Sequence, residues 1–240
     1  RGVLVDGVSG KPSDRVKPGS SIESPPPELV AELMPESVDF EVIHEDDDLI
    51  VVDKPPGIVV HPGAGRTEGT LVAGLLHRYP ELRGVGTPGR WGLVHRLDRD
   101  TSGILLVGRT HQAFQKLTTD LADRRIGRVY TAMVNGIFTT QTGTIDAPIG
   151  RDPTRPTRRA VVPGGKPAIT HYEVVSAFPE VGVSLLEVRL DTGRTHQIRV
   201  HMKHIGHPVF NDERYGGDRI VKGTVFTKYK QFVDNCFTIC

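Results

Sequence analysis

The chain has 240 residues, a charged fraction of 25% and a formal net charge of +1, which together predict a soluble globular protein with one sizeable core. No apolar run approaches the roughly 20 residues that a membrane-spanning helix needs, and the first residues lack the basic-then-apolar pattern of a signal peptide. The two cysteines, Cys236 and Cys240, both lie near the last residue, which argues against a disulfide framework and predicts a reducing, cytoplasmic setting.

The charges are distributed unevenly along the chain. Eleven of the 29 acidic residues lie between residues 23 and 53, where there is no Lys or Arg, so 18 acidic residues face 30 basic ones elsewhere. Segregation of this kind is compatible with a polyanionic partner bound on one face. An ordinary solvated surface with one acidic loop explains the charge pattern equally well.

The chain opens with short β-branched runs separated by Gly and Pro, which predict small strands and turns over residues 1–23. Three prolines at 25–27 favour an extended spacer, so residues 24–38 are expected to be a linker. The pattern changes near residue 39, where the main domain is expected to begin and to continue to residue 240.

The main domain is expected to start with both strands and helices. Residues 40–63 predict two strands broken by an acidic turn, with a rigid Pro-Pro-Gly turn after Lys54. Residues 70–78 predict a short amphipathic helix. A strand over 104–107 then leads into a helix over 110–126, for which Thr110 is a suitable N-cap.

The second half predicts mainly strands. They are expected over residues 128–138, 168–178 and 183–193, followed by a helix over 195–206 that Gly206 closes. Residues 151–167 are rich in Pro and Arg, and we expect the prolines to prevent regular structure there. Adjacent strands with few crossover helices predict an α+β fold around a largely antiparallel sheet.

Three segments concentrate polar residues at strand ends or turns: 95–103, 128–130 and 192–201. If Asp98 faced Arg199 across a cleft, the pair would keep the carboxylate ionised, as a nucleophile requires, and Tyr130 would add an aromatic face. Arg194 is a second candidate partner. The residues alone leave open a structural alternative, in which Asp98 caps a turn, Arg199 lies on a helix surface and Tyr130 is part of the core.

The histidines permit a metal hypothesis, which the spacing does not favour. His196, His201, His204 and His207 are clustered, but no pair has the i, i+4 spacing of a zinc-binding helix. We expect His61 and His95 to orient loops through hydrogen bonds. No glycine-rich dinucleotide or phosphate-loop motif is present.

The proline-rich segment 151–167 is strongly basic. It contains one acidic residue, Asp152, against five basic ones. A loop of this composition suits contacts with phosphates, which weaken steeply as salt rises. Binding of RNA or DNA is therefore plausible from composition. The basic residues are Arg151, Arg155, Arg158, Arg159 and Lys166.

Four motifs in order resemble the RluA/RluD-type pseudouridine synthases, which isomerise uridine in ribosomal and transfer RNA to its carbon-linked form. The first is KPPGIVVHPG at 54–63 and the second is HRLDRDTSGILLV at 95–107. RVYTAMVNG at 128–136 and TGRTHQIRVHMKHIGHPVFND at 192–212 follow. The resemblance covers residues 40–217 and implies the family's α+β catalytic fold.

The resemblance also implies roles for individual residues. Asp98 takes the place of the catalytic aspartate, Tyr130 that of the tyrosine that stacks on the base, and Arg199 that of the arginine that pairs with the aspartate. Arg96 matches a residue that enters the RNA stack where the target nucleotide is flipped out. The further residues expected to contact RNA are His95, Arg99, Arg128, Arg194, Arg158 and Arg159. The family requires no cofactor and no metal.

The two ends depart from the family pattern. Residues 1–23 are similar to the last strands of a small S4-like RNA-binding domain, and after residue 217 we expect the catalytic domain, 39–240, to be incomplete. The predicted function is isomerisation of uridines in large-subunit ribosomal RNA by a monomer that does not bind membranes. Transfer RNA as the substrate, a non-catalytic RNA-binding module and a zinc hydrolase are the alternatives.

Overall fold

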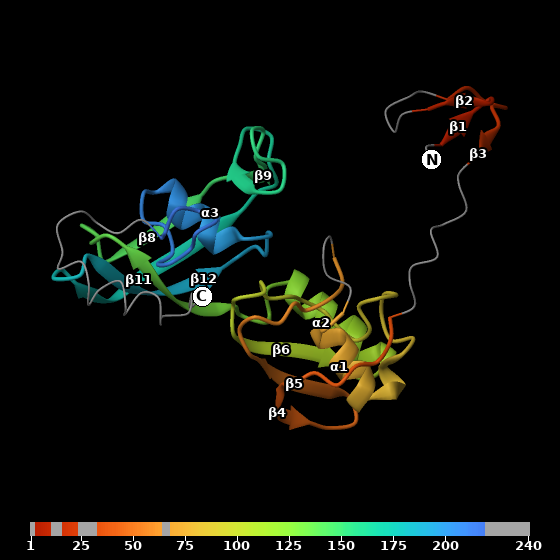
Figure 1. The fold of residues 1–240 in the computed structure, drawn as a ribbon, viewed down its shortest axis with the longest axis horizontal. Coiled ribbons are helices and arrows are strands. Elements are labelled where there is room, and N and C mark those ends of the chain that lie inside the picture. The colour runs from red at the N-terminus through yellow and green to blue at the C-terminus, as the bar shows by residue number, and fades with distance from the viewer. Residues whose placement is uncertain (1–2, 11–15, 24–32, 64–67, 219–240) are drawn as a thin grey trace. The chain divides into compact units, whose positions relative to one another are not determined.

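The computed structural model describes residues 3–10, 16–23, 33–63 and 68–218 (Figure 1). The chain divides into two compact units, Arg1–Met34 and Pro35–Cys240. Cys236, Cys240 and the other residues after 218 lie outside the described residues, as does most of the expected linker. Among the helices of the described part, none is long and apolar enough to cross a membrane.

The first unit contains three short antiparallel strands in the order β2-β1-β3. Strands β1 (Leu4–Val5) and β2 (Val8–Ser9) are joined by Asp6 and Gly7, and β3 is Ile22–Glu23. Both turn residues have positive φ, 51° and 78°, which is the conformation of the tight hairpin turn that Asp-Gly favours. The small strands expected from the Gly and Pro pattern are therefore confirmed in the described residues.

The second unit begins with a three-stranded antiparallel sheet in the order β4-β5-β6. Its strands are Glu41–Glu45, Leu49–Lys54 and Gly103–Gly108. Alternate residues of β5 point to the core, so Ile50, Val52 and Lys54 are all fully buried. Period-two alternation thus places a lysine at a core position of this sheet.

Two helices accompany the first sheet, and each begins at a threonine. The Thr70 side chain accepts a hydrogen bond from the Ala73 backbone at the start of α1 (Leu71–Arg78), and Thr110 caps α2 (His111–Ala122) in the same way. A 3₁₀ turn, η1 (Pro80–Leu82), follows α1. Helix α2 ends four residues before its predicted end, because the chain turns at Asp123 and Arg124 takes a left-handed φ of 59°.

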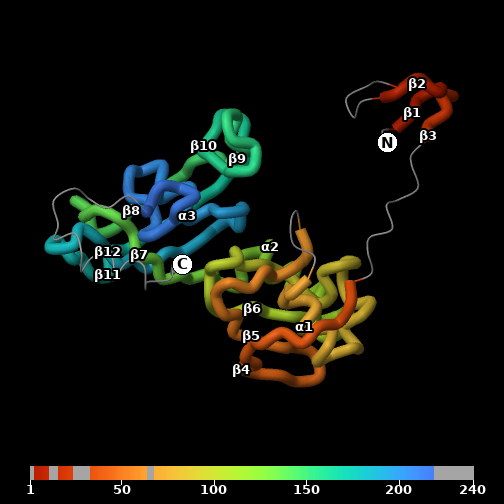
Figure 2. Tube along the Cα trace, viewed as in Figure 1, coloured from red at the N-terminus to blue at the C-terminus, as the bar shows by residue number. Residues whose placement is uncertain are grey.

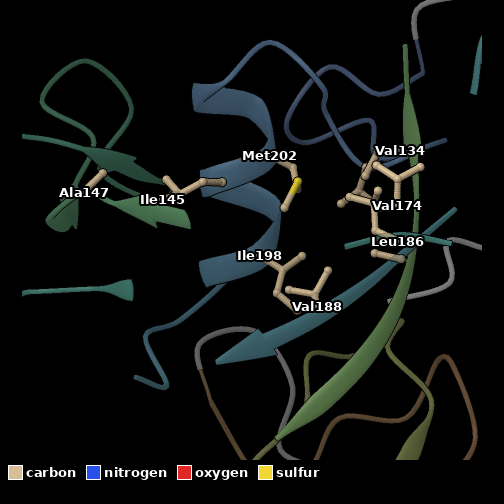
Figure 3. Close-up of a cluster of buried hydrophobic side chains, with 10 residues drawn as sticks. Val134, Ile145, Ala147, Val174, Leu186, Val188, Ile198 and Met202 are labelled. Carbon is tan, nitrogen blue, oxygen red and sulfur yellow. The ribbon is translucent and has the colours of Figure 1, made fainter. Parts of the chain in front are cut away.

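A four-stranded antiparallel sheet in the order β7-β12-β11-β8 forms the second part of this unit. Helix α3 packs on it and inserts Ile198 and Met202 among the side chains of its strands (Figure 3). The antiparallel α+β prediction is confirmed. The elements are β7 (Val129–Asn135), β8 (Thr142–Asp146), β11 (Ile169–Phe178), β12 (Val183–Leu190) and α3 (Gln197–His204).

Two local expectations were wrong. The segment 151–167 is not wholly irregular, because β9 (Ile149–Arg151) pairs with β10 (Arg159–Val161) in an antiparallel hairpin, visible in Figure 2. The prolines lie outside the paired residues, where they do not interrupt the ladder. The polar segment 95–103 does not follow a strand either, since the residues before it contribute only one bridge, between Leu93 and Val107.

Candidate active site

A cavity of about 260 Å³ lies where the segment 94–101, the start of β7 and the segment 190–199 meet. Its lining includes the three residues expected to be catalytic, Asp98, Tyr130 and Arg199. They come from positions up to 101 residues apart in the chain. Five further cationic or titratable side chains share the lining: His95, Arg96, Arg128, Arg194 and His196.

Asp98 and Arg199 form the expected ion pair. Arg199 Nη1 donates to Asp98 Oδ2 at 3.1 Å, and both side chains are less than one fifth exposed. The Asp98 backbone carbonyl also accepts a hydrogen bond from the Thr101 amide. Asp98 therefore does close a turn, as the structural alternative proposed, but it does so through its backbone and leaves the carboxylate to face Arg199.

A second carboxylate, which the sequence analysis did not single out, also binds Arg199. Asp212 accepts from Nε at 2.7 Å and from Nη2 at 3.0 Å, and only 3% of its surface is exposed. Burial acts to lower the pKa of Arg199, but the hydrogen bonds and charges of Asp212 and then Asp98 raise it above its ordinary value. Arg199 is thus a permanently charged bridge between two carboxylates.

His196 is another site residue whose place in the cavity was not foreseen. Its Nε2 lies 3.8 Å from Asp98 Oδ2, and its Nδ1 is 2.7 Å from the Tyr215 hydroxyl. Burial lowers its pKa to about 4, against an opposing effect of the Asp98 charge. The only sequence signal was its position three residues before Arg199, where a turn preceding the helix can return a side chain to the same cavity.

The cavity also has an aromatic wall. Tyr130 is half-buried on β7, where it pairs with Val188 of the central strand β12. A side chain anchored in a sheet loses little further entropy when a planar base stacks on it. Its position beside Asp98 fits the stacking role that the resemblance implies.

The arginines expected to contact RNA differ in their hydrogen-bond and ion-pair partners. Arg96 is exposed at the cavity, whereas Arg99 forms a bidentate surface pair with Asp100 at 2.8 Å. Arg128 donates to the Asp191 carbonyl and Arg194 to the Pro167 carbonyl. Arg128 and Arg194 keep their positive charges, because carbonyl partners do not neutralise a guanidinium.

The Arg128 guanidinium lies close to the backbone at Gly193. A Cβ at position 193 would clash with Arg128 Nη1, so any other residue there would displace the end of this side chain. Arg128 Nε is buried without a hydrogen-bond partner, which is costly and uncommon away from functional sites. The loop 191–194 therefore shapes the position of Arg128 at the cavity.

His95, which is expected to contact RNA, lines the cavity and is held by a backbone hydrogen bond. Its Nε2 accepts a hydrogen bond from the Leu106 amide at 2.9 Å. Burial, assisted by the nearby charge of Arg128, lowers its pKa to about 4, so the ring is neutral near pH 7. Its contact is with β6, which agrees with the expectation that it orients a loop.

The other clustered histidines serve the fold. His201 is fully buried between Thr170 and the Ala147 carbonyl, and His207 contacts the Asn135 carbonyl. In the part of the chain that the structure describes, no three His, Cys, Asp or Glu side chains are grouped to hold a metal ion. The geometry therefore offers nothing in favour of the zinc hydrolase alternative.

A buried lysine ties the loop that carries Asp98 to the first sheet. Lys54 Nζ donates to the carbonyls of Pro55, Ile58 and Arg99 at 2.8, 3.0 and 2.9 Å. Burial lowers its pKa to about 8, although the charges of Asp100, Asp98 and Asp53 oppose that shift. The Pro-Pro-Gly turn and the loop that carries Asp98 are thus held at one ammonium group.

Comparison with known proteins identifies the family. The RNA pseudouridylate synthase family profile matches residues 48–204. An uncharacterised RNA pseudouridine synthase of Chloroflexus aurantiacus is 50% identical over 218 residues, covering 90% of this chain and 68% of that protein. The ribosomal large subunit pseudouridine synthase D of Haemophilus ducreyi is 48% identical over 183 residues, or 76% of this chain.

The shared length and a solved structure complete the comparison. The chain spans about half, 54%, of the Haemophilus ducreyi protein. The solved structure of human RNA pseudouridylate synthase domain containing 1 has a TM-score of 0.62 and 28% identity, covering 85% of this chain and 76% of that one. The region that the family profile matches contains Asp98, Tyr130 and Arg199. The chain belongs to the RNA pseudouridylate synthase family.

Proposed function

We propose that this chain isomerises uridine in RNA to pseudouridine, with Asp98 as the catalytic carboxylate. The observation that carries the proposal is the convergence of Asp98, Tyr130 and Arg199 on one cavity. The reaction breaks the bond from N1 of uracil to C1′ of ribose and forms one from C5 to C1′. The C5 proton is lost and N1 gains a proton, so no external oxidant or reductant is needed.

The cavity suits this chemistry electrostatically. Cleavage of a glycosidic bond develops positive charge at C1′, and a carboxylate held beside that carbon stabilises it, or attacks it as a nucleophile. Arg199 keeps Asp98 ionised, and Tyr130 provides a face on which the detached uracil can stack while it rotates. We propose no role for a cofactor or a metal ion.

The surroundings of the cavity support RNA as the substrate. We propose that Arg96 enters the stack of the flipped-out nucleotide and that Arg128, Arg194, Arg158 and Arg159 bind flanking phosphates. The strands of the first unit are proposed to belong to an S4-like RNA-binding domain, and the setting to be cytoplasmic. Large-subunit ribosomal RNA is the proposed target, because that is the substrate class named for the Haemophilus ducreyi relative.

Release of tritium from C5-labelled uridine tests the proposal. Wild type, Asp98→Asn and a control, Asp123→Asn, would be incubated with labelled large-subunit ribosomal and transfer RNA transcripts. Asp123 is a surface residue paired only with Arg125 among the described ion pairs. We expect release from the ribosomal transcript by wild type and the control, and loss of release with Asp98→Asn.

The other outcomes separate the alternatives. Release from the transfer RNA transcript alone would make transfer RNA the substrate. A folded wild type that binds RNA without releasing tritium would favour the non-catalytic binding module. Unchanged release by Asp98→Asn would refute the assigned role of this carboxylate.

A further inference from the structure

The backbone at His196 is held in an unusual conformation. This residue is the N-cap of α3 and has φ 57° and ψ 28°, in the left-handed region. A residue with a side chain occupies that region at a cost, and such strain is concentrated at functional sites. The side chain does not cap the helix. Its ring is instead among the side chains that line the cavity.

The hydrogen bonds of Tyr215 favour one of the two neutral forms of the His196 ring. Tyr215 Oη accepts from the Arg159 backbone amide at 3.1 Å, which leaves its own hydroxyl proton available for His196 Nδ1 at 2.7 Å. A neutral ring that accepts at Nδ1 has its proton on Nε2. Nε2 is the nitrogen that faces Asp98.

We propose that His196 is a positioning residue, whose Nε2–H orients the Asp98 carboxylate together with Arg199. This inference rests on the proposed function. Both contacts, from Arg199 Nη1 at 3.1 Å and from His196 Nε2 at 3.8 Å, are made to Oδ2. The other oxygen, Oδ1, is thereby directed to the ribose. Catalytic hydrogen bonds that are long in the free enzyme shorten when substrate closes the site.

The same contacts connect the carboxylate to the basic hairpin. Tyr215 is nearly fully buried, and the Arg199 guanidinium lies 4.9 Å from the centre of its ring. The Arg159 amide that holds its hydroxyl belongs to the first residue of β10. A path of polar contacts therefore runs from the strand that carries Arg159, through Tyr215 and His196, to Asp98.

Two substitutions at His196 separate positioning from folding. His196→Asn suits the left-handed backbone, since Asn adopts it more readily than most residues, and its short side chain cannot reach Asp98. His196→Gln fits that backbone less well, but its amide nitrogen extends to about the position of Nε2. His204→Asn is the matched control, because His204 is exposed on the same helix.

The rate of tritium release in a single turnover at saturating RNA is the first readout, with RNA affinity measured separately. We expect His196→Asn to lower that rate about tenfold or more, as loss of a preorganised donor does, and to leave affinity unchanged. His196→Gln should recover part of the rate despite its poorer backbone fit. Tyr215→Phe should also slow tritium release. When it is combined with His196→Asn, the loss of rate, expressed as a free energy, should be smaller than the sum of the losses in the two single variants.

A second readout does not depend on turnover. Long-range ¹⁵N–¹H spectra of the histidine rings report which nitrogen of His196 is protonated, in wild type and in Asp98→Asn. A proton on Nε2 supports the proposal, and a proton on Nδ1 overturns it. If wild type releases tritium and His196→Asn is as fast at saturating RNA, the proposal is also overturned while the proposed function stands. Absence of release by wild type, with Nε2 protonated, would refute the proposed function instead.

Discussion

Arg199 is bound by two carboxylates of different character. Asp212 is almost fully buried and binds two of its nitrogens, whereas Asp98 lines the cavity and binds one. The planar guanidinium fork can satisfy both because its donors are fixed at different angles. The buried pair therefore orients Arg199, and Arg199 in turn presents a charge to the Asp98 carboxylate.

Asp212→Asn tests whether Asp212 orients Arg199. The substitution removes one of the two carboxylate charges on Arg199 and weakens two buried charged hydrogen bonds, while Asp98 remains as a partner. We therefore expect the free energy of unfolding to fall by about 2 kcal/mol and tritium release to slow. Denaturant unfolding measures the stability change. Glu187→Gln is the control. Glu187 Oε1 accepts two hydrogen bonds from Arg189 at the surface, so this substitution should lower the free energy of unfolding by less than about 1 kcal/mol. Equal effects in the two variants would contradict the assignment.

The burial of Lys54 predicts a pH dependence of stability. Its pKa is about 8 in the folded chain and 10.5 ordinarily, so between these values the unfolded chain binds more protons. The free energy of unfolding of wild type relative to Lys54→Met should therefore rise with pH, by about 2 kcal/mol between about pH 8 and pH 10. Denaturant unfolding at several pH values measures the difference. The exposed Lys116, replaced by Met, should give no such rise, and a flat Lys54 difference would refute the prediction.

At the scale of elements, the β9–β10 hairpin brings basic residues from both sides of its loop together. Arg151 pairs with Arg159 across the strands, and Arg155 and Arg158 lie in the connection. Tyr215 holds the first residue of β10 through its amide. The hairpin is therefore a defined surface attached to the site and not a free basic loop.

Neutralising the hairpin should weaken RNA binding in a salt-dependent way. In a variant with Arg155→Gln and Arg158→Gln, we expect lower affinity for RNA. We also expect a shallower slope of log affinity against log salt concentration. The slope should change by about 0.7–0.9 for each phosphate that the variant no longer neutralises. Fluorescence anisotropy with labelled RNA over a range of salt concentrations measures both. Arg189→Gln, at an exposed residue of β12, should leave the slope unchanged. An unaltered slope in the hairpin variant would exclude this surface from RNA binding.

At the scale of the whole molecule, the apolar core belongs to one of the two units. The buried hydrophobic residues of the described part all lie between Ile50 and Tyr215, within the unit Pro35–Cys240. The described strands of the unit Arg1–Met34 have only two residues each. The larger unit is thus expected to fold by itself, because burial of apolar surface provides most of the stability.

Removal of residues 1–34 tests this independence. We expect the midpoint of thermal unfolding and the single-turnover rate at saturating RNA to remain as in the full chain, while affinity for RNA falls. Calorimetry and the tritium assay, each run on both chains, measure these quantities. A lower rate at saturating RNA would show that the first unit contributes to the chemistry itself.

Local patterns predicted most of the elements correctly. Amphipathic periodicity located α1 and α2, Thr110 marked the start of α2, and β-branched runs located most strands of both sheets. The end of α2 was misplaced, because the turn at Arg124 uses a left-handed conformation that Arg does not signal. The β9–β10 pairing was missed, because its register depends on contacts between strands and not on composition.

By itself the sequence determined the α+β class and the segments that carry polar residues, since local periodicity resides in neighbouring residues. The pairing of Asp98 with Arg199 was implied only through the family resemblance of the ordered motifs. Only the tertiary structure decided that Asp212, His196 and Tyr215 complete the site and that His95 faces β6. The physical reason is that a buried charge takes whichever partners the fold brings within hydrogen-bond distance. Those partners come from distant segments, so their spacing in the chain carries no mark of the contact.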